Sequence, residues 1–303
     1  MEKVIIIGAG PAGISAALYA VRGNLDPLVI NNGIGALEKA EKIENYYGLE
    51  HPLSGQELYD TGIAQAKAIG VRMLDAQVLG VVGFDTFVVK TTEGEFETQS
   101  LILATGSKRA APKIPGIKEF EGRGVSYCAI CDAFFYRGKD VAVLGNGDFA
   151  MHEAKELANT ASTVTIYTNG EEPEFTLEGN ISVNTMKIQS VEGDELVSGI
   201  RLAPDMQAQE TDSDTEKAVG EFCHADGLFI AMGTAGSTEI ARQMGAELTE
   251  KGNILVNENM ETTIPGLYAA GDCTGGLLQV AKAVCDGAQA GINAGKYVRS
   301  LNK

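Results

Sequence analysis

Short apolar runs recur along the chain, and most are followed by a turn of small residues. The clearest are residues 4–7, 101–103, 140–144 and 227–231. Such runs are typical of parallel strands that are buried on both faces. Helices are expected between them, at residues 14–22, 54–69, 151–159 and 279–300, and shorter strands at 27–30, 164–167, 253–257 and 266–270. This alternation predicts an α/β fold in which helices cover parallel sheets.

The first strand leads into a glycine turn. Gly8, Gly10 and Gly13, with Pro11 and Ala12 between them, form the pattern G-x-G-x-x-G. In such a turn the glycines allow a sharp bend, close approach of the backbone to a pyrophosphate, and tight packing of the next helix on the strand. The helix that follows would direct its N-terminus at the phosphates. The order of strand, turn and helix therefore favours a dinucleotide site over a glycine turn without a ligand.

The same order returns in the middle of the chain. A strand at residues 140–144 is followed by the turn G-x-G-x-x-A at 145–150 and by a helix. Pro112 and Pro115 precede it and mark a linker. We therefore predict two Rossmann-like domains of three layers each, the second inserted in the first. Residues 1–112 plus 236–303 would form the discontinuous first domain, and residues 113–235 the inserted one.

The second glycine turn is poorly suited to a phosphate. Asp148 places a carboxylate where a helix start would otherwise attract an anion, and Phe149 adds bulk. The next strand is followed by Thr-Asn-Gly at residues 168–170, with no Arg or Lys to hold a 2′-phosphate. Residues 138–221 contain 17 acidic and 5 basic residues, and the polar stretch 207–217 is expected to be an exposed loop. Electrostatics therefore oppose a dinucleotide phosphate in this domain.

Cys128 and Cys131 form a C-x-x-C pair that is followed directly by Asp132. Two thiols at this spacing can close a small disulfide, and a helix start lowers the pKa of at least one of them, which suits exchange with another disulfide. Half of a zinc site is the alternative, but it needs a second Cys or His pair at ligand spacing. The remaining cysteines stand apart, at Cys223, Cys273 and Cys285. A redox pair is therefore favoured, and no metal is expected.

The composition of the chain limits its binding partners and the compartment in which it is expected. The 303-residue chain has a net charge of −17 and five cysteines. An acidic chain is a poor partner for nucleic acid or an anionic membrane, and a modest, odd number of cysteines fits a reducing compartment. Residues 4–21 lack charge and resemble a signal-peptide core, but glycines break the apolar run. We therefore expect a cytoplasmic protein that binds neither nucleic acid nor membrane.

Together these motifs resemble the low-molecular-weight thioredoxin reductases. The two glycine turns, C-x-x-C-D followed by Phe-Phe-Tyr-Arg, Ala-Thr-Gly at 104–106 and Ala-Ala-Gly-Asp at 269–272 occur in that family's order and span essentially the whole chain. The resemblance implies FAD in the split domain, a redox disulfide on the inserted domain, and a homodimer. It assigns attack on thioredoxin to Cys128, the thiol facing the flavin to Cys131, and proton transfer to Asp132. Capping of the Cys helix is an alternative role for Asp132.

The resemblance also implies which residues hold FAD. The glycines of the first turn would cradle the pyrophosphate, Asp272 would bind the ribityl or phosphate region, and Gln279 would lie near the ring. Asn31 stands at the end of the second strand, where Asp or Glu usually binds the ribose, and an amide can still bond to it. The expected set is Gly8, Gly10, Pro11, Ala12, Gly13, Asn31, Asn45, Ala104, Thr105, Gly106, Gly271, Asp272, Leu278, Gln279 and Val280.

Departures from the family pattern concern the electron donor. The family's NADPH loop has the form G-x-G-N-[ST]-A and its 2′-phosphate grip is H-R-R, but this chain has Asp148-Phe149 and Thr-Asn-Gly at those places. The family's G-G-Q-L segment after the second strand is replaced near residues 35–37. The chain thus resembles the flavin thioredoxin reductases that accept electrons from ferredoxin.

We therefore expect a FAD-dependent disulfide reductase that passes electrons from ferredoxin, or another low-potential donor, through FAD and the Cys pair to thioredoxin or a thioredoxin-like protein. Two alternatives remain open: a flavin dithiol oxidase that uses oxygen, and an NAD(P)H-dependent reductase with an atypical nucleotide site. A non-enzymatic flavin-binding protein would leave C-x-x-C-D unexplained. An acidic ferredoxin would need a basic face, for which Lys108, Arg109, Lys113 and Lys118 are candidates, although a solvated charge run is the commoner explanation.

Overall fold

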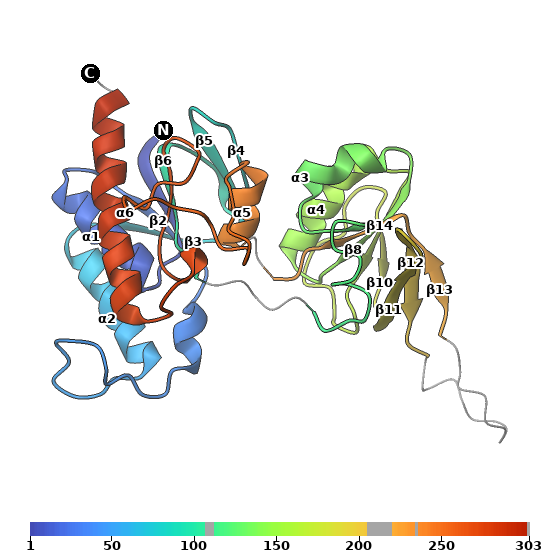
Figure 1. Ribbon diagram of the computed structural model, residues 1–303, viewed down its shortest axis with the longest axis horizontal. Helices are drawn as coiled ribbons and strands as arrows, with labels where there is room; N and C mark the ends of the chain where they lie inside the picture. The colour runs from blue at the N-terminus through green and yellow to red at the C-terminus, as the bar shows by residue number, and fades with distance from the viewer. Residues whose placement is uncertain (107–111, 205–219, 234–235, 302–303) are drawn as a thin grey trace. The chain divides into compact units, whose positions relative to one another are not determined.

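A computed structural model describes residues 1–106, 112–204, 220–233 and 236–301. The chain divides into two compact units, one formed by Met1–Arg109 with Ala235–Lys303 and the other by Ala110–Thr234. Each unit combines a largely parallel sheet with helices (Figure 1), which confirms the predicted α/β, Rossmann-like fold class. The predicted loop at 207–217 and the basic residues Lys108 and Arg109 lie outside the described residues.

The first unit is built on a seven-stranded sheet. Its strand order is β3-β2-β1-β6-β5-β4, and β15 pairs with β6. Strands β1, β2, β3, β6 and β15 are mutually parallel, whereas β5 pairs antiparallel with both β4 and β6. The strands are β1 (Glu2–Ile7), β2 (Leu28–Asn31), β3 (Arg72–Asp75), β4 (Val78–Val82), β5 (Phe87–Thr91), β6 (Gly94–Leu103) and β15 (Leu267–Ala269). The carboxyl ends of the parallel strands therefore meet at one edge of the sheet.

Two helices of this unit pack unusually closely. Helices α1 (Pro11–Arg22) and α6 (Val280–Leu301) lie side by side (Figure 1). A Cβ atom at Gly287 would lie 2.0 Å from the Ala12 carbonyl oxygen, and one at Gly291 would lie 2.3 Å from that of Ala16. Small residues on both helices therefore permit the contact. The other helical segments are η1 (Gly35–Lys39), α2 (Gly55–Ala68), α5 (Ser237–Gln243) and η3 (Asp272–Thr274).

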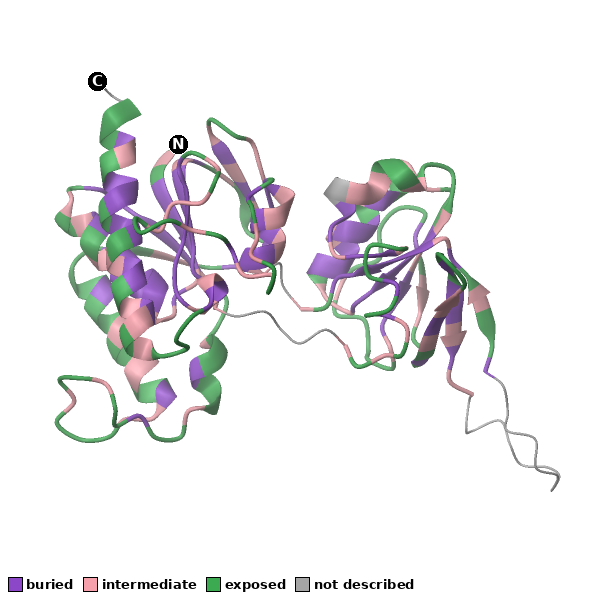
Figure 2. Ribbon diagram, viewed as in Figure 1, coloured by how far each residue is buried: buried purple, intermediate pink, exposed green. Residues whose placement is uncertain are grey.

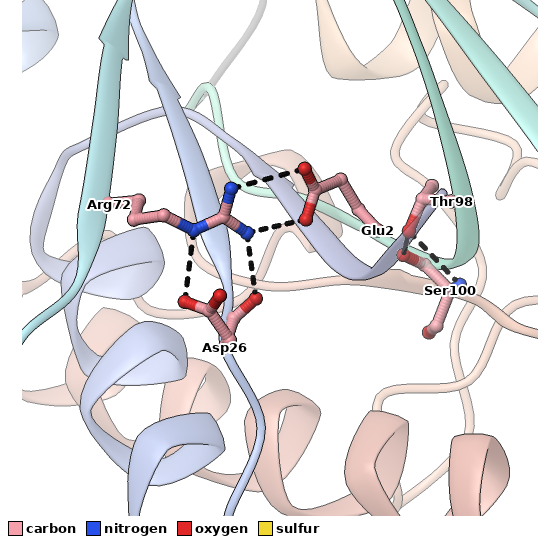
Figure 3. A network of polar contacts seen from close by, with 5 residues as sticks. All are labelled: Glu2, Asp26, Arg72, Thr98 and Ser100. Carbon is pink, nitrogen blue, oxygen red and sulfur yellow. Dashed lines mark hydrogen bonds and ion pairs between the residues drawn. The ribbon is translucent and has the colours of Figure 1, made fainter.

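A charged network ties edge strand β3 to the start of β1 (Figure 3). The Arg72 guanidinium donates to both carboxylate oxygens of Glu2 through its two terminal nitrogens, and its Nε donates to Asp26 Oδ1 at 2.9 Å. These hydrogen bonds raise the pKa of Arg72. β3 lies at the edge of the sheet and pairs only with β2. The network therefore adds a second connection between β3 and the rest of the sheet.

The second unit contains two sheets. The first is parallel with the order β10-β9-β8-β14-β7, and the second is antiparallel with the order β11-β12-β13. The strands are β7 (Val125–Ser126), β8 (Asp140–Leu144), β9 (Thr163–Tyr167), β10 (Ser182–Asn184), β11 (Ile188–Gly193), β12 (Val197–Leu202), β13 (Phe222–His224) and β14 (Gly227–Ile230). The helical segments are α3 (Ala129–Asp132), η2 (Ala133–Tyr136) and α4 (Asp148–Ala158).

The central strands of both units are buried (Figure 2). Val4, Ile5 and Ile6 are fully buried in β1, as a strand covered on both faces requires. The prediction of a strand at residues 253–257 is wrong, because this segment contributes only an isolated bridge between Ile254 and Leu248. Within the described part of the chain, no helix is long and apolar enough to cross a membrane.

Candidate cofactor and redox sites

The three glycines of the first turn serve different purposes. A Cβ atom at Gly8 would lie 2.4 Å from the Ala104 carbonyl oxygen, and Gly8 has a φ of 106°, so side chains are excluded there. A Cβ atom at Gly13 would lie 1.8 Å from the Gly8 carbonyl oxygen. At Gly10, in contrast, a Cβ atom would meet no other atom within 4 Å. Two glycines therefore allow the strand, turn and helix to pack, and the third faces open space.

The open side of this turn fits a pyrophosphate. Gly10 is the N-cap of α1, which has Pro11 at its start and no side-chain cap, and no acidic residue lies in its first turn. The helix therefore offers backbone N–H groups and a positive dipole end to an anion. The extended conformation of Gly10 leaves the approach unobstructed. This geometry suits the phosphates of FAD.

At the carboxyl end of β2, the Asn31 amide has two partners. Tyr59 Oη donates to Asn31 Oδ1 at 2.7 Å, and Asn31 Nδ2 donates to Asp75 Oδ1 at 2.7 Å. Asp75 is the residue paired with Asn31 in the register of β2 with β3, and it is exposed. The carboxylate that is missing from the end of β2 is thus present one strand away. Sequence reasoning missed Asp75, since only strand pairing brings it to this position.

The segment between β15 and α6 holds the predicted Gly271 and Asp272 in a polar network. Gly271 has a φ of 85°, and its N–H donates to the buried carboxylate of Asp286 at 3.1 Å. Lys282 Nζ lies 2.7 Å from the same Asp286 oxygen and donates to the Gly271 carbonyl at 2.8 Å. Burial raises the pKa of Asp272, an effect that the charge of Lys282 opposes. Neither Lys282 nor Asp286 was singled out from the sequence.

Other predicted cofactor residues are brought together from distant parts of the chain. Asn45 Nδ2 donates to Gln279 Oε1 at 3.0 Å across 234 positions of sequence. Thr105 and Ser237 form two reciprocal hydrogen bonds, in which the backbone N–H of each residue donates to the hydroxyl of the other, at 3.0 and 2.8 Å. The remaining members lie at element ends: Ala104 and Gly106 follow β6, Leu278 is exposed before α6, and Val280 is its first residue. The roles of these residues toward FAD stay predictions.

The second unit carries the cysteine motif. Cys128 directly precedes α3, is 2 % exposed and is disulfide-bonded, whereas Cys223, Cys273 and Cys285 are free. The backbone of Cys131 lies in α3, and its side chain is outside the described part of the structure. The described residues contain no group of three or more His, Cys, Asp or Glu side chains placed to hold a metal ion.

Ser126 links Asp132 to the start of the cysteine motif. Its Oγ donates to Asp132 Oδ2 at 2.6 Å and accepts the Cys128 N–H at 3.1 Å. Asp132 is the last residue of α3 and makes no side-chain cap bond to the η2 segment that follows. The alternative in which Asp132 caps the start of the Cys helix is therefore wrong. Sequence reasoning missed Ser126, although it lies only two residues before Cys128.

A buried acid also contacts this motif. Glu153 of α4 is 1 % exposed, and its Oε2 accepts the Ala129 N–H at 2.6 Å. Burial raises the pKa of Glu153 to about 7. Its sequence position could have revealed it, because Phe149, Glu153 and Leu157 lie four residues apart on the buried face of α4.

The second glycine turn has the expected backbone but a different surface. A Cβ atom at Gly145 would lie 2.2 Å from the Ala231 carbonyl oxygen, so this glycine is needed for packing. Asp148 is exposed at the start of α4, as predicted. The Phe149 ring is 3 % exposed, which corrects the prediction that it adds bulk at the open side of the turn.

The segment at residues 171–174 contacts this turn through its backbone. The Glu174 N–H donates to the Asn146 carbonyl oxygen at 2.6 Å. At residues 168–170 the side chains are also engaged, since Thr168 Oγ1 donates to the Glu171 carbonyl and Asn169 Oδ1 accepts the Ile188 N–H. One prediction needs correction here: the stem of Lys187 lies against Gly170, within 2.8 Å of where a Cβ would be, so a cation is near the loop.

The chain is similar to known proteins over nearly its whole length. Residues 2–287 match the family described as pyridine nucleotide-disulphide oxidoreductase. Thioredoxin reductases from Aquifex aeolicus and Bacillus subtilis are 36 % and 34 % identical to the chain; each alignment covers 99 % of it and 94 % or 96 % of the relative.

Solved structures that resemble this chain are also thioredoxin reductases. An atypical thioredoxin reductase from Desulfovibrio vulgaris Hildenborough matches with a TM-score of 0.89 and 38 % identity over 99 % of both chains. A ferredoxin-flavin thioredoxin reductase from Clostridium acetobutylicum matches with a TM-score of 0.70 and 30 % identity over 99 % of this chain and 98 % of that one. The chain therefore belongs to the pyridine nucleotide-disulphide oxidoreductase family and, within it, to the FAD-binding low-molecular-weight thioredoxin reductases.

Proposed function

We propose that this flavin-dependent disulfide reductase takes electrons from a low-potential donor such as reduced ferredoxin, and not from NADPH, and delivers them to a thioredoxin or thioredoxin-like protein. The observation that carries the proposal is the acidic segment at residues 171–174, which is tied to the second glycine turn by the 2.6 Å hydrogen bond from the Glu174 N–H to the Asn146 carbonyl oxygen. In a nucleotide-binding domain a pyrophosphate binds at such a turn. Here the open side of the turn at Gly147 has an acidic segment beside it.

Charge at the second turn supports the same conclusion. Asp148, Glu172 and Glu174 are exposed on or beside the turn, where the phosphates of NADPH would need cations. Two missing charge-assisted hydrogen bonds would each cost about 1.5–3 kcal/mol, or together roughly 10²–10⁴ in affinity. Lys187, whose stem lies against Gly170, can offset part of this loss. The balance disfavours NADPH.

The residues of the Cys motif suit thiol–disulfide exchange. When bound, FAD supplies the electron-transfer chemistry that connects the donor to the disulfide. Reduced Cys128 would attack the thioredoxin disulfide and form a mixed disulfide, which Cys131 would resolve, so that two electrons leave the pair. The position of Cys128 at the start of α3 favours its thiolate. Asp132, held by Ser126, would give and take the protons of the exchange.

The comparisons support a thioredoxin reductase, but they do not determine its electron donor. The Clostridium acetobutylicum structure is described as a ferredoxin-flavin thioredoxin reductase. Proteins described only as thioredoxin reductases have a comparable sequence identity to this chain. Lys113 and Lys118 are exposed and stay candidates for docking an acidic donor. We also propose that the protein functions as a homodimer.

Anaerobic reduction of the purified flavoprotein tests the donor. Reduced ferredoxin should bleach the flavin absorbance rapidly, whereas NADPH and NADH should act very slowly. Cys128→Ser is the matched control: its flavin should still be reduced by ferredoxin, but thioredoxin should not be. Rapid stoichiometric bleaching by micromolar NADPH would refute the proposal. Oxygen consumption with a small dithiol, without reduction of thioredoxin, would instead support a dithiol oxidase.

A further inference from the structure

Glu153 is a buried acid, and among the described residues only one of its two carboxylate oxygens has a hydrogen-bond partner. Its Oε2 accepts the Ala129 N–H at 2.6 Å, but Oε1 is buried and has no hydrogen-bond partner among the described residues. A buried carboxylate oxygen without a donor is costly. The cost falls if the group takes up a proton, so this carboxyl is poised between two protonation states.

The acid lies at the start of the redox helix. Ala129 is the first residue of α3 and the covalent neighbour of the disulfide-bonded Cys128. Glu153 therefore occupies the position of an N-terminal cap, but it comes from another helix, α4. The Ala129 N–H stabilises the negative charge of Glu153. A thiolate at Cys128 would place a second negative charge on the residue next to this N–H.

Glu153 has few charged neighbours that could compensate it. Burial is the largest cause of its raised pKa, the Ala129 bond opposes the rise, and the charge of Glu156 on the same helix adds to it. The elements packed against α4 are α3, η2, β8 and β9. The titratable side chains on α4 and on these elements, apart from Cys131, are Asp132, Tyr136, Asp140, Asp148, His152, Lys155, Glu156 and Tyr167.

We propose that Glu153 is a positioning residue of the redox motif that binds a proton when the Cys128 disulfide is reduced and releases it when the disulfide forms again. This inference rests on the proposed function only in that the Cys pair cycles between disulfide and dithiol. Two electrons and one proton convert the disulfide into one thiolate and one thiol. A further proton converts the Glu153 carboxylate into the acid.

The linkage has a definite sign. A thiolate beside the α3 start disfavours the Glu153 carboxylate, so the pKa of Glu153 is higher in the reduced protein than in the oxidised one, where it is about 7. Proton binding at Glu153 therefore favours reduction fully below about pH 7, and this advantage is lost as pH rises through the reduced-state pKa. A coupling of about one pK unit would change the equilibrium constant for reduction about tenfold across this window.

The test measures the equilibrium between the Cys pair and dithiothreitol buffers, from about pH 6 to about pH 9. Acid quenching, alkylation and mass spectrometry of the Cys128 peptide give the reduced fraction of the holoprotein, independently of any donor or thioredoxin. Glu153→Gln keeps an oxygen to accept the Ala129 N–H but cannot ionise. Glu195→Gln, an exposed residue of the same unit, is the control for net charge.

The ratio of the wild-type to the Glu153→Gln equilibrium constant should fall about tenfold between the ends of this pH range, and Glu195→Gln should follow the wild type. Parallel pH profiles for wild type and Glu153→Gln would overturn the inference. If Glu153→Gln does not fold, infrared difference spectra of the wild type decide instead, because reduction at neutral pH should produce a protonated carboxyl band, and its absence would overturn the inference. If the Cys pair shows the expected pH dependence but does not reduce thioredoxin, the proposed function is contradicted and the inference about Glu153 is not.

Discussion

Replacing Ser126 by Ala tests whether one hydroxyl organises the redox motif. The change removes the 2.6 Å bond to Asp132 and the 3.1 Å bond from the Cys128 N–H. Ser126 is 7 % exposed, so water replaces neither bond easily. Losing a bond to a charged group costs about 1.5–3 kcal/mol and losing a neutral one about 0.5–1.5 kcal/mol. We expect the second unit to be destabilised by about 2–4.5 kcal/mol, the sum of the two losses.

Catalysis should suffer as well, because Asp132 would lose the bond that fixes its carboxylate next to the Cys motif. A proton-transferring group typically contributes about 10²–10⁴-fold to a rate, and a misplaced one retains part of that. We expect thioredoxin reduction to slow by about 10–100-fold, while the rate of flavin reduction by the electron donor stays the same. Stopped-flow measurements of the two half-reactions separate these effects.

Two further variants control the Ser126 experiment. Ser126→Thr keeps the hydroxyl and should recover most of the loss. Ser198→Ala removes an exposed hydroxyl that donates to the Glu192 carbonyl at 3.3 Å in the same unit, and it should resemble the wild type. If Ser126→Ala melts and turns over like the wild type, Ser126 does not hold Asp132 in solution.

Gly10→Val should abolish FAD retention with little effect on folding, because the site is extended and open; flavin absorbance and circular dichroism check this. Gly8→Val should instead destabilise the fold, and retained flavin in Gly10→Val would contradict the assigned site. Arg72→Met should destabilise the first unit by about 1 kcal/mol at low salt and less at high salt, as shown by thermal melts. The control Lys42→Met breaks the exposed ion pair with Glu44 and should leave the melting temperature unchanged. Equal losses of stability in both variants would refute the stabilising role of the Arg72 network.

Much of the fold could be predicted because burial on both faces leaves a strong pattern. The apolar run at residues 4–7 corresponds to β1, and the small residues of the final helix correspond to the close contact between α6 and α1. The antiparallel strands β11 and β12 were not predicted. Their burial varies from residue to residue, so they lack the continuous apolar run that identifies a buried strand.

The candidate sites were predictable where chemistry follows local order, as in the glycine turn and the C-x-x-C pair. They were not predictable where folding supplies the partner. Asp75 reaches the end of β2 only through strand register, and Lys187 reaches Gly170 from beyond another strand. Glu153 approaches Ala129 from 24 residues away. Each of these side chains changes the electrostatics of its site, which sequence spacing alone does not show.

The two glycine turns show how much of the G-x-G motif is required by packing alone. In the first turn, Gly8 and Gly13 are required by backbone contacts, and only Gly10 faces the side from which a phosphate would approach. In the second turn, Gly145 is required by contact with Ala231, and Gly147 likewise faces open space. Most of the pattern therefore reports the packing of a strand against a helix. What distinguishes a phosphate site is the surface around the open glycine, which is free of acidic residues in the first turn of α1 and begins with Asp148 in α4. A glycine pattern thus predicts the fold of both units, whereas the charge around the open glycine decides how well a dinucleotide phosphate fits.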